Sequence, residues 1–186
     1  RNEQNTEFPG VGQRSALSGE TVYSFLMGAT SQPFVVDHRV FGSILVPGAA
    51  WVAGVLGALG PQKRLEQVSF YQPLRLGEME ERPVQIVFSP AQEEKQMFSV
   101  WSGPAPWTRH AEGWIYAGKV SAPISGISVH QMQEKPVEKL FEGFSRMGVE
   151  LGSLFRSIRR VWAGKEEALT ELIIPNYIPN ASLPIP

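Results

Sequence analysis

An uncharged apolar segment is the clearest feature of the hydrophobic pattern along the chain. No Asp, Glu, Lys or Arg occurs between Gly42 and Gln62, and within this stretch Pro47-Gly48 precedes the residues AAWVAGVLGAL. Proline is favoured at the first position of a helix and Gly60-Pro61 supplies a stop, so the pattern predicts a helix from Ala49 to Leu59. A helix that is apolar on every side is expected to be buried on every side.

Alternating apolar and polar positions follow this helix and predict strands at 84–88, 98–101 and 111–116. Before the helix, Phe34-Val35-Val36 is typical of a short strand that leads into Asp37-His38. Residues 1–32 are expected to be irregular and turn-rich, with one amphipathic patch from Val22 to Leu26. One buried helix followed by antiparallel strands is an α+β pattern. A sheet curled around a central helix, the hotdog fold, is its most economical arrangement.

The pattern changes near Pro136 and indicates a second unit. Apolar residues at helical spacing follow this proline, and 159–174 is typical of two strands joined at Ala163-Gly164-Lys165. The preceding stretch has weak periodicity, and no second buried helix is indicated. We therefore divide the chain into a first hotdog with an N-terminal extension (1–120), a linker (121–135) and an incomplete second hotdog (136–186).

Composition narrows the class of protein. The net charge of −1 and the 19% of charged residues give no sign of a nucleic-acid-binding surface. The absence of cysteine excludes disulfides and suits a cytoplasmic protein. The apolar run from Ile44 to Gly60 is short for a membrane span and is broken by Pro47 and four glycines, so no membrane partner is expected.

A histidine and a helix start lie close together in the stretch DHRVFGSILVPG. The first unpaired N–H groups of a helix, and its dipole, suit a carbonyl oxygen that gains negative charge. Gly48 would let a substrate approach this backbone closely. His38 as a base beside such a site could remove a proton α to a thioester carbonyl. A structural histidine before an ordinary helix start has the same spacing, so spacing alone leaves both interpretations open.

Four segments resemble the polyketide synthase dehydratase family. DHRVFGSILVPGAAW resembles the family's H-x-x-x-G-x-x-x-x-P signature. VSFYQPLRL, WTRHAEGWI and FEGFSRMGVELGSLFRSI resemble three further segments of the family, in the same order. The resemblance implies the N-terminal part of a double-hotdog domain that eliminates water from a β-hydroxyacyl thioester. The substrate would be carried on the phosphopantetheine arm of an acyl carrier protein, with no other cofactor and no metal.

The same resemblance implies roles for individual residues. His38 would be the catalytic base, and Gly48 would donate the N–H of the oxyanion site, with Gly42 and Pro47 in the same substrate-binding stretch. Further candidates, for lining the substrate tunnel, are Leu151, Gly152 and Phe155. Partners would be the carrier protein and neighbouring synthase domains, and a homodimer is left open.

The chain also departs from the family pattern. The family uses an Asp on the second hotdog's helix for the departing hydroxyl, whereas Asp37 is the only aspartate here. As a strand neighbour of His38, Asp37 is expected to point away from the imidazole, which leaves Glu112 and Glu150 as candidates for an unusual acid. The family's Tyr-Gly-Pro is replaced by 151–153, Leu-Gly-Ser. The alternative is a dehydratase-like domain that does not dehydrate but holds carrier-bound chains, acts as a scaffold, or performs isomerisation, cyclisation or chain branching.

Residues outside these motifs are expected to be structural. His110 and His130 lack the clustered partners of a metal site. Trp101, Trp107 and Trp114 could line an acyl tunnel, but packing is the role we expect for them.

Overall fold

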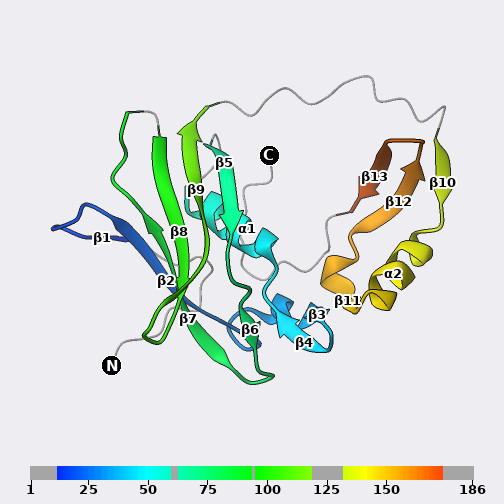
Figure 1. Cartoon of the computed structure of the whole chain (residues 1–186), viewed down its shortest axis with the longest axis horizontal. Coiled ribbons are helices and arrows are strands. Elements are labelled where there is room, and N and C mark those ends of the chain that lie inside the picture. Colours follow the sequence, from blue (N-terminus) through cyan, green and yellow to red (C-terminus); the bar gives the residue numbers. More distant parts are fainter. Residues whose placement is uncertain (1–11, 60–62, 94, 119–131, 174–186) are drawn as a thin grey trace.

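The computed structural model of the chain describes residues 12–59, 63–93, 95–118 and 132–173. The described residues form a larger lobe (12–118) and a smaller lobe (132–173), joined by a small sheet (Figure 1). No helix in the described ranges is long and apolar enough to cross a membrane.

The larger lobe is built on a six-stranded antiparallel sheet. The strands lie in the order β1 (Gly12–Arg14), β2 (Thr21–Gly28), β7 (Glu81–Phe88), β8 (Lys95–Ser102), β9 (Thr108–Ala117) and β5 (Lys63–Phe70). Helix α1 (Gly48–Leu59) packs on one face of this sheet, where Trp51 and Val55 join the inward residues of the central strands in a single core. The predicted hotdog fold, its central helix and its three alternating strands are confirmed.

The expectation that α1 is buried on every side is wrong. Its buried residues are Ala50, Trp51, Gly54 and Val55, which lie on one face at helical spacing. The opposite face, which includes Val52 and Leu56, is only half-buried because the sheet covers one side of the helix.

Two predictions for the N-terminal region are also wrong. Residues 21–28 form strand β2 between β1 and β7, with Phe25 and Met27 buried in the core. Leu26, an apolar residue on the outward face, hides this alternation in the sequence. Residues 34–36 lie in a 3-10 helix, η1 (Pro33–Asp37), rather than in a strand. Pro33 stands in its first turn, where the fixed φ of proline suits a helical start.

A small four-stranded sheet joins the lobes in the order β11 (Val149–Leu151), β3 (His38–Val40), β4 (Ser43–Leu45) and β6 (Arg75–Leu76). Strand β11 belongs to the smaller lobe, and the other three belong to the larger one. All the pairs are antiparallel. This sheet places the histidine segment directly against the second unit of the chain.

The smaller lobe contains the predicted helix and hairpin. They are α2 (Val137–Arg146), β12 (Ile158–Ala163) and β13 (Ala168–Leu172), with a 3-10 turn η2 (Ser153–Phe155) between helix and hairpin. Residues 133–135, placed in the linker from the sequence, form strand β10 (Gln133–Lys135), which pairs with β12. Most of the proposed linker, including His130, lies outside the described residues.

Candidate functional site

The imidazole of His38 is held by a backbone carbonyl across a tight hairpin. His38 begins β3, and its Nδ1 lies 2.7 Å from the carbonyl oxygen of Leu45 at the end of β4. A carbonyl oxygen only accepts hydrogen bonds, so Nδ1 must carry the proton in the neutral ring. Nε2 is then the unprotonated nitrogen, and no described residue hydrogen-bonds to it. The backbone therefore selects the tautomer that a general base needs.

The start of α1 follows this hairpin after two residues. Gly48 is the first residue of the helix, three positions beyond Leu45, which limits their separation to about 10 Å along the chain. The first N–H groups of a helix have no partner within it. The ring of Phe70 lies on Gly48, and its nearest carbon would be 3.0 Å from a Cβ at that position. A side chain at position 48 would therefore displace Phe70, which gives a packing reason for glycine in addition to the predicted approach of a substrate.

Gly42 lies at the other end of the same hairpin. Arg39 pairs with Ile44 and Val40 with Ser43, so Phe41 and Gly42 form a two-residue turn between β3 and β4. Both have positive φ, 48° and 76°, as a type I′ turn requires. The structure does not bring Gly42 to the imidazole. Its conformation accounts for glycine at this position, and its contact with substrate stays a prediction.

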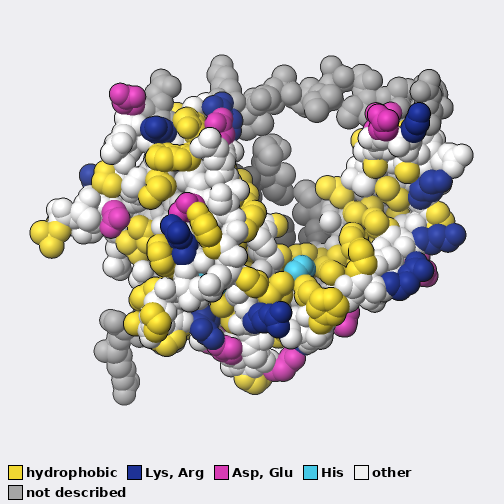
Figure 2. Space-filling view, viewed as in Figure 1, with side chains coloured by type: hydrophobic (Ala, Val, Ile, Leu, Met, Phe, Trp, Pro, Cys, Tyr) yellow, Lys and Arg dark blue, Asp and Glu magenta, His cyan; other side chains and the backbone are white. Residues whose placement is uncertain are grey.

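The structure does bring the three predicted tunnel residues to His38. Leu151 in β11 is the cross-strand partner of His38 in β3. The ring of Phe155 packs against the imidazole at a centroid distance of 5.4 Å. Gly152 connects the two, and its N–H donates a 2.8 Å hydrogen bond to the carbonyl of Asp37. Figure 2 shows a histidine side chain at the surface between the lobes, bordered by hydrophobic side chains.

Asp37 holds the smaller lobe in place rather than serving as a free acid. Its carboxylate accepts a 2.9 Å hydrogen bond from the backbone N–H of Leu154 and a 3.4 Å bond from the hydroxyl of Ser153. A Cβ on Gly152 would overlap the carboxylate of Asp37, so a larger residue at position 152 would displace that carboxylate. Asp37 is not the strand residue predicted from the sequence, because it ends η1. The family's Pro position, occupied here by Ser153, thus contributes a hydrogen bond to Asp37.

Neither glutamate considered as an unusual acid lies beside the imidazole. Glu150 pairs across the strands with Arg39, and Leu151 pairs with His38. Neighbouring residues on a strand point to opposite faces, so Glu150 and His38 lie on different faces of the small sheet. The pKa of Arg39 is raised mainly by its hydrogen bonds to Glu78, with a smaller contribution from the charge of Glu150.

Glu112 is fully engaged on the outer face of the six-stranded sheet. It accepts hydrogen bonds from the hydroxyl of Tyr71 and, at 2.6 Å, from Arg109. The hydrogen bond to Glu112 is the main cause that raises the pKa of Tyr71, and the positive charge of Arg109 opposes this effect. Glu112 alternates with the inward residues of β9, so it points away from α1 and from the hairpin that carries His38.

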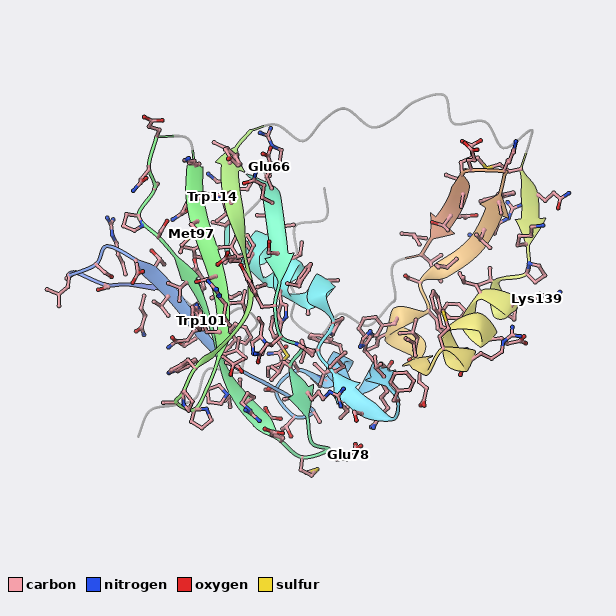
Figure 3. All side chains as sticks on the ribbon, viewed as in Figure 1. Glu66, Glu78, Met97, Trp101, Trp114 and Lys139 are labelled. Carbon is pink, nitrogen blue, oxygen red and sulfur yellow. The ribbon has the colours of Figure 1, made fainter. Side chains whose placement is uncertain are left out.

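The tryptophans of β8 and β9 lie on this same outer face. Figure 3 shows Trp101 and Trp114 on neighbouring strands of the larger lobe. Arg109 lies over Trp101 at 5.7 Å, and Lys95 lies over Trp114 at 4.8 Å. Such cation–π contacts stabilise an exposed sheet face. These two side chains face away from the core helix.

Three elements of the site carried no signal in the sequence. The carbonyl of Leu45 is a backbone group, so residue type does not reveal it. Phe70 reaches Gly48 only through the fold, since β5 follows α1 in the chain. Strand β11 has three residues and is defined by its pairing with β3, more than a hundred positions earlier. Among the described residues there is no group of three or more His, Cys, Asp or Glu placed to hold a metal ion.

Comparison with known proteins agrees with this geometry. The family model for the polyketide synthase dehydratase domain matches residues 9–103, just over half of the chain. The chain belongs to this dehydratase family. The match spans the hairpin with His38, the start of α1, and strands β7 and β8.

Curated relatives of this dehydratase-family chain are polyketide synthases. Polyketide synthase GfsB of Streptomyces halstedii is 29% identical over 172 residues, which cover 84% of this chain and 3% of that protein. The pikromycin synthase component PikAII of Streptomyces venezuelae is 28% identical, covering 94% of this chain and 5% of that protein. The chain thus corresponds to a small part of each relative.

Solved structures of single dehydratase domains also resemble the chain. The dehydratase domain from the CurJ module of curacin polyketide synthase is 28% identical, with a TM-score of 0.84 over 93% of this chain. An inactive histidine-to-phenylalanine mutant of the CurJ dehydratase, in complex with compound 21, is 26% identical with a TM-score of 0.82. This chain spans 64% of each of these two domains.

Proposed function

We propose that the chain supplies the base and the oxyanion site of a polyketide synthase dehydratase. The substrate is a β-hydroxyacyl thioester carried by the phosphopantetheine arm of an acyl carrier protein. The observation that carries this proposal is the 2.7 Å contact between Nδ1 of His38 and the carbonyl of Leu45, which leaves Nε2 unprotonated beside the second lobe. The inactive histidine-to-phenylalanine mutant of the CurJ dehydratase supports a required histidine in this class of domain.

The elimination proceeds from this geometry in two parts. Nε2 of His38 takes the proton from the α carbon, and the electron pair of the broken C–H bond moves toward the thioester carbonyl. The carbonyl oxygen gains negative charge, which the N–H of Gly48 and the N-terminal end of α1 stabilise. The new imidazolium is stabilised through Nδ1–H by the Leu45 carbonyl. The electron pair then forms the α,β double bond as the C–O bond to the β-hydroxyl breaks.

Protonation of the departing hydroxyl is the step for which neither Asp37 nor Glu150 is available. Hydroxide is a poor leaving group and leaves as water only if it receives a proton. Asp37, the only aspartate, is committed to Leu154 and Ser153, and Glu150 lies on the opposite face of β11 from the His38 partner. The proposal therefore separates the base function of His38 from an acid function that neither of these two carboxylates supplies.

The test compares two leaving groups on the same acyl chain. A β-chloroacyl pantetheine thioester loses chloride, which needs no proton, whereas its β-hydroxyacyl counterpart needs an acid. The chain is expected to form enoyl thioester from the chloro compound above the uncatalysed rate and to form none from the hydroxy compound, both followed by mass spectrometry. His38→Ala is expected to lower the chloride elimination by about a hundredfold, the usual contribution of a general base.

The matched control is Glu166→Gln, in the exposed turn between β12 and β13. It is expected to match the parent chain in rate. No His38-dependent elimination of chloride would refute the base assignment and favour a carrier-binding or scaffolding domain. His38-dependent loss of water from the hydroxy compound would show that an acid is present, and the assignment of Asp37 to a structural role would then be the first to re-examine.

A further inference from the structure

A second histidine lies in the core beneath the start of α1. His110 in β9 is 2% exposed, and both ring nitrogens are bonded. Its Nδ1 lies 2.6 Å from the carbonyl of Gln72, and its Nε2 lies 2.7 Å from the hydroxyl of Ser102. The carbonyl can only accept, so Nδ1–H donates to Gln72 and the hydroxyl of Ser102 donates to Nε2. The ring is thus held in one tautomer and one orientation.

His110 anchors the segment 70–74, which covers the start of α1. Besides the Gln72 bond, the backbone carbonyl of His110 accepts a 2.9 Å hydrogen bond from the N–H of Tyr71. At one end of the segment, Phe70 lies on Gly48. At the other end, the carbonyl of Leu74 accepts a 2.9 Å bond from the N–H of Val46, two residues before Gly48.

The same imidazole contacts the first turn of α1 directly. It stacks on Trp51 at a centroid distance of 5.8 Å and an interplanar angle of 24°. Trp51 is 3% exposed and lies three residues after Gly48. His110 therefore touches both the helix turn that carries Gly48 and the segment that covers it.

We propose that His110 is a positioning residue for the acyl-binding turn at Gly48, acting through the segment 70–74 and through Trp51. This inference rests on the proposed function, because the turn matters only if its N–H groups receive the thioester oxygen. Oxyanion donors act by being fixed before the charge develops, and a displacement of about 1 Å at a reacting group can cost on the order of a hundredfold in rate. A loosened turn should lower kcat more than it raises KM.

Two substitutions of His110 distinguish the hydrogen bond made by Nδ1 from the one made by Nε2. In His110→Asn the amide nitrogen can take the place of Nδ1 and keep the bond to Gln72. In His110→Gln the amide nitrogen reaches the place of Nε2 instead, so the bond to the carbonyl of Gln72 is lost. With the β-chloroacyl thioester, His110→Gln is expected to lower kcat about tenfold or more with KM changed less than about twofold, and His110→Asn is expected to retain more of kcat.

The matched control is Phe88→Leu, a core substitution in β7 that lies outside the segment 70–74 and α1. It destabilises the fold while leaving the turn in place, so its kcat is expected to stay at the parent value. If His110→Gln does not fold, Ser102→Ala replaces it, since it frees Nε2 and lets the ring rotate. Equal kcat values for His110→Gln and His110→Asn, or an equal loss in Phe88→Leu, would overturn the proposal.

Amide hydrogen exchange keeps the inference distinct from the proposed function. The amide of Val46, bonded to Leu74, is expected to exchange at least tenfold faster in His110→Gln than in His110→Asn, while amides shared by β2 and β7 keep equal rates. A parent chain without His38-dependent elimination would refute the proposed function, and the Val46 amide would then decide the positioning role alone. Unchanged exchange at Val46 would refute that role.

Discussion

At the scale of residues, the two described histidines show why function could not be predicted from residue type alone. Both donate Nδ1–H to a backbone carbonyl, Leu45 for His38 and Gln72 for His110. They differ at Nε2, which no described residue bonds in His38 and which Ser102 occupies in His110. The family signature predicts His38 as the base, whereas the tautomer of its ring depends on a carbonyl that no sequence motif marks.

Gly42 provides a test at this scale, because it has a positive φ and a predicted contact with substrate. A residue other than glycine that tolerates positive φ would satisfy the first role but not the second. Alanine at φ 76° is strained, and the substitution is expected to lower the free energy of unfolding by about 1 kcal/mol. Asparagine tolerates this conformation better, so Gly42→Asn should cost less. Urea denaturation measures both. A turn role predicts that chloride elimination by Gly42→Asn matches that of the parent, and a large loss of rate in a stable Gly42→Asn protein would instead support substrate contact.

At the scale of elements, local periodicity was sufficient where an element is long and one face is buried. It predicted α1, α2, the hairpin of β12 and β13, and the three central strands of the larger lobe. It failed for β2, where an outward Leu26 breaks the alternation, and for η1, where three apolar residues fit a strand as well as a turn. It could not find β11, because three residues become a strand only by pairing with β3.

The junction between η1 and η2 is the element contact most open to a direct test. Asp37→Ala removes the acceptor of the Leu154 N–H. A hydrogen bond to a charged group contributes about 1.5–3 kcal/mol to the free energy of unfolding. Because this contact is partly exposed, we expect the substitution to cost less than that range. The amides of Gly152 and Leu154 should exchange faster with solvent. Asp37→Asn keeps one acceptor oxygen and should show a smaller change. Equal exchange in Asp37→Ala and the parent would contradict the assigned role of this carboxylate.

At the scale of the whole molecule, the site lies where the larger and smaller lobes meet. The larger lobe contributes His38, the proposed base, and the start of α1, and the smaller lobe contributes Leu151, Gly152 and Phe155. The family resemblance predicts both groups as site residues, and their contact with substrate stays a prediction. It did not predict that Asp37 ties the lobes together, because that role depends on the contacts of a folded chain.

Stability should depend on pH through the core histidine. Burial lowers the pKa of His110 below its usual value of 6.5, so the folded chain binds this proton more weakly than the unfolded chain does. Its contribution to stability is therefore present above pH 6.5 and is lost as the pH falls below that value. Urea denaturation at pH 6.5 and pH 5.5 should show a fall in unfolding free energy that is smaller in His110→Asn. An equal fall in both proteins would assign the effect to other groups.

The central claim is that His38 removes an α proton without help from an acid, and deuterium incorporation measures this step alone. The chain is incubated in D2O with a β-hydroxyacyl pantetheine thioester, and the deuterium content of the recovered thioester is followed by mass spectrometry. We expect one α position to gain deuterium above the uncatalysed rate, with no enoyl product, and we expect His38→Ala to lose about a hundredfold of that rate. Exchange that is equal in the parent and His38→Ala, in protein that remains folded, would contradict the assignment of His38 as the base.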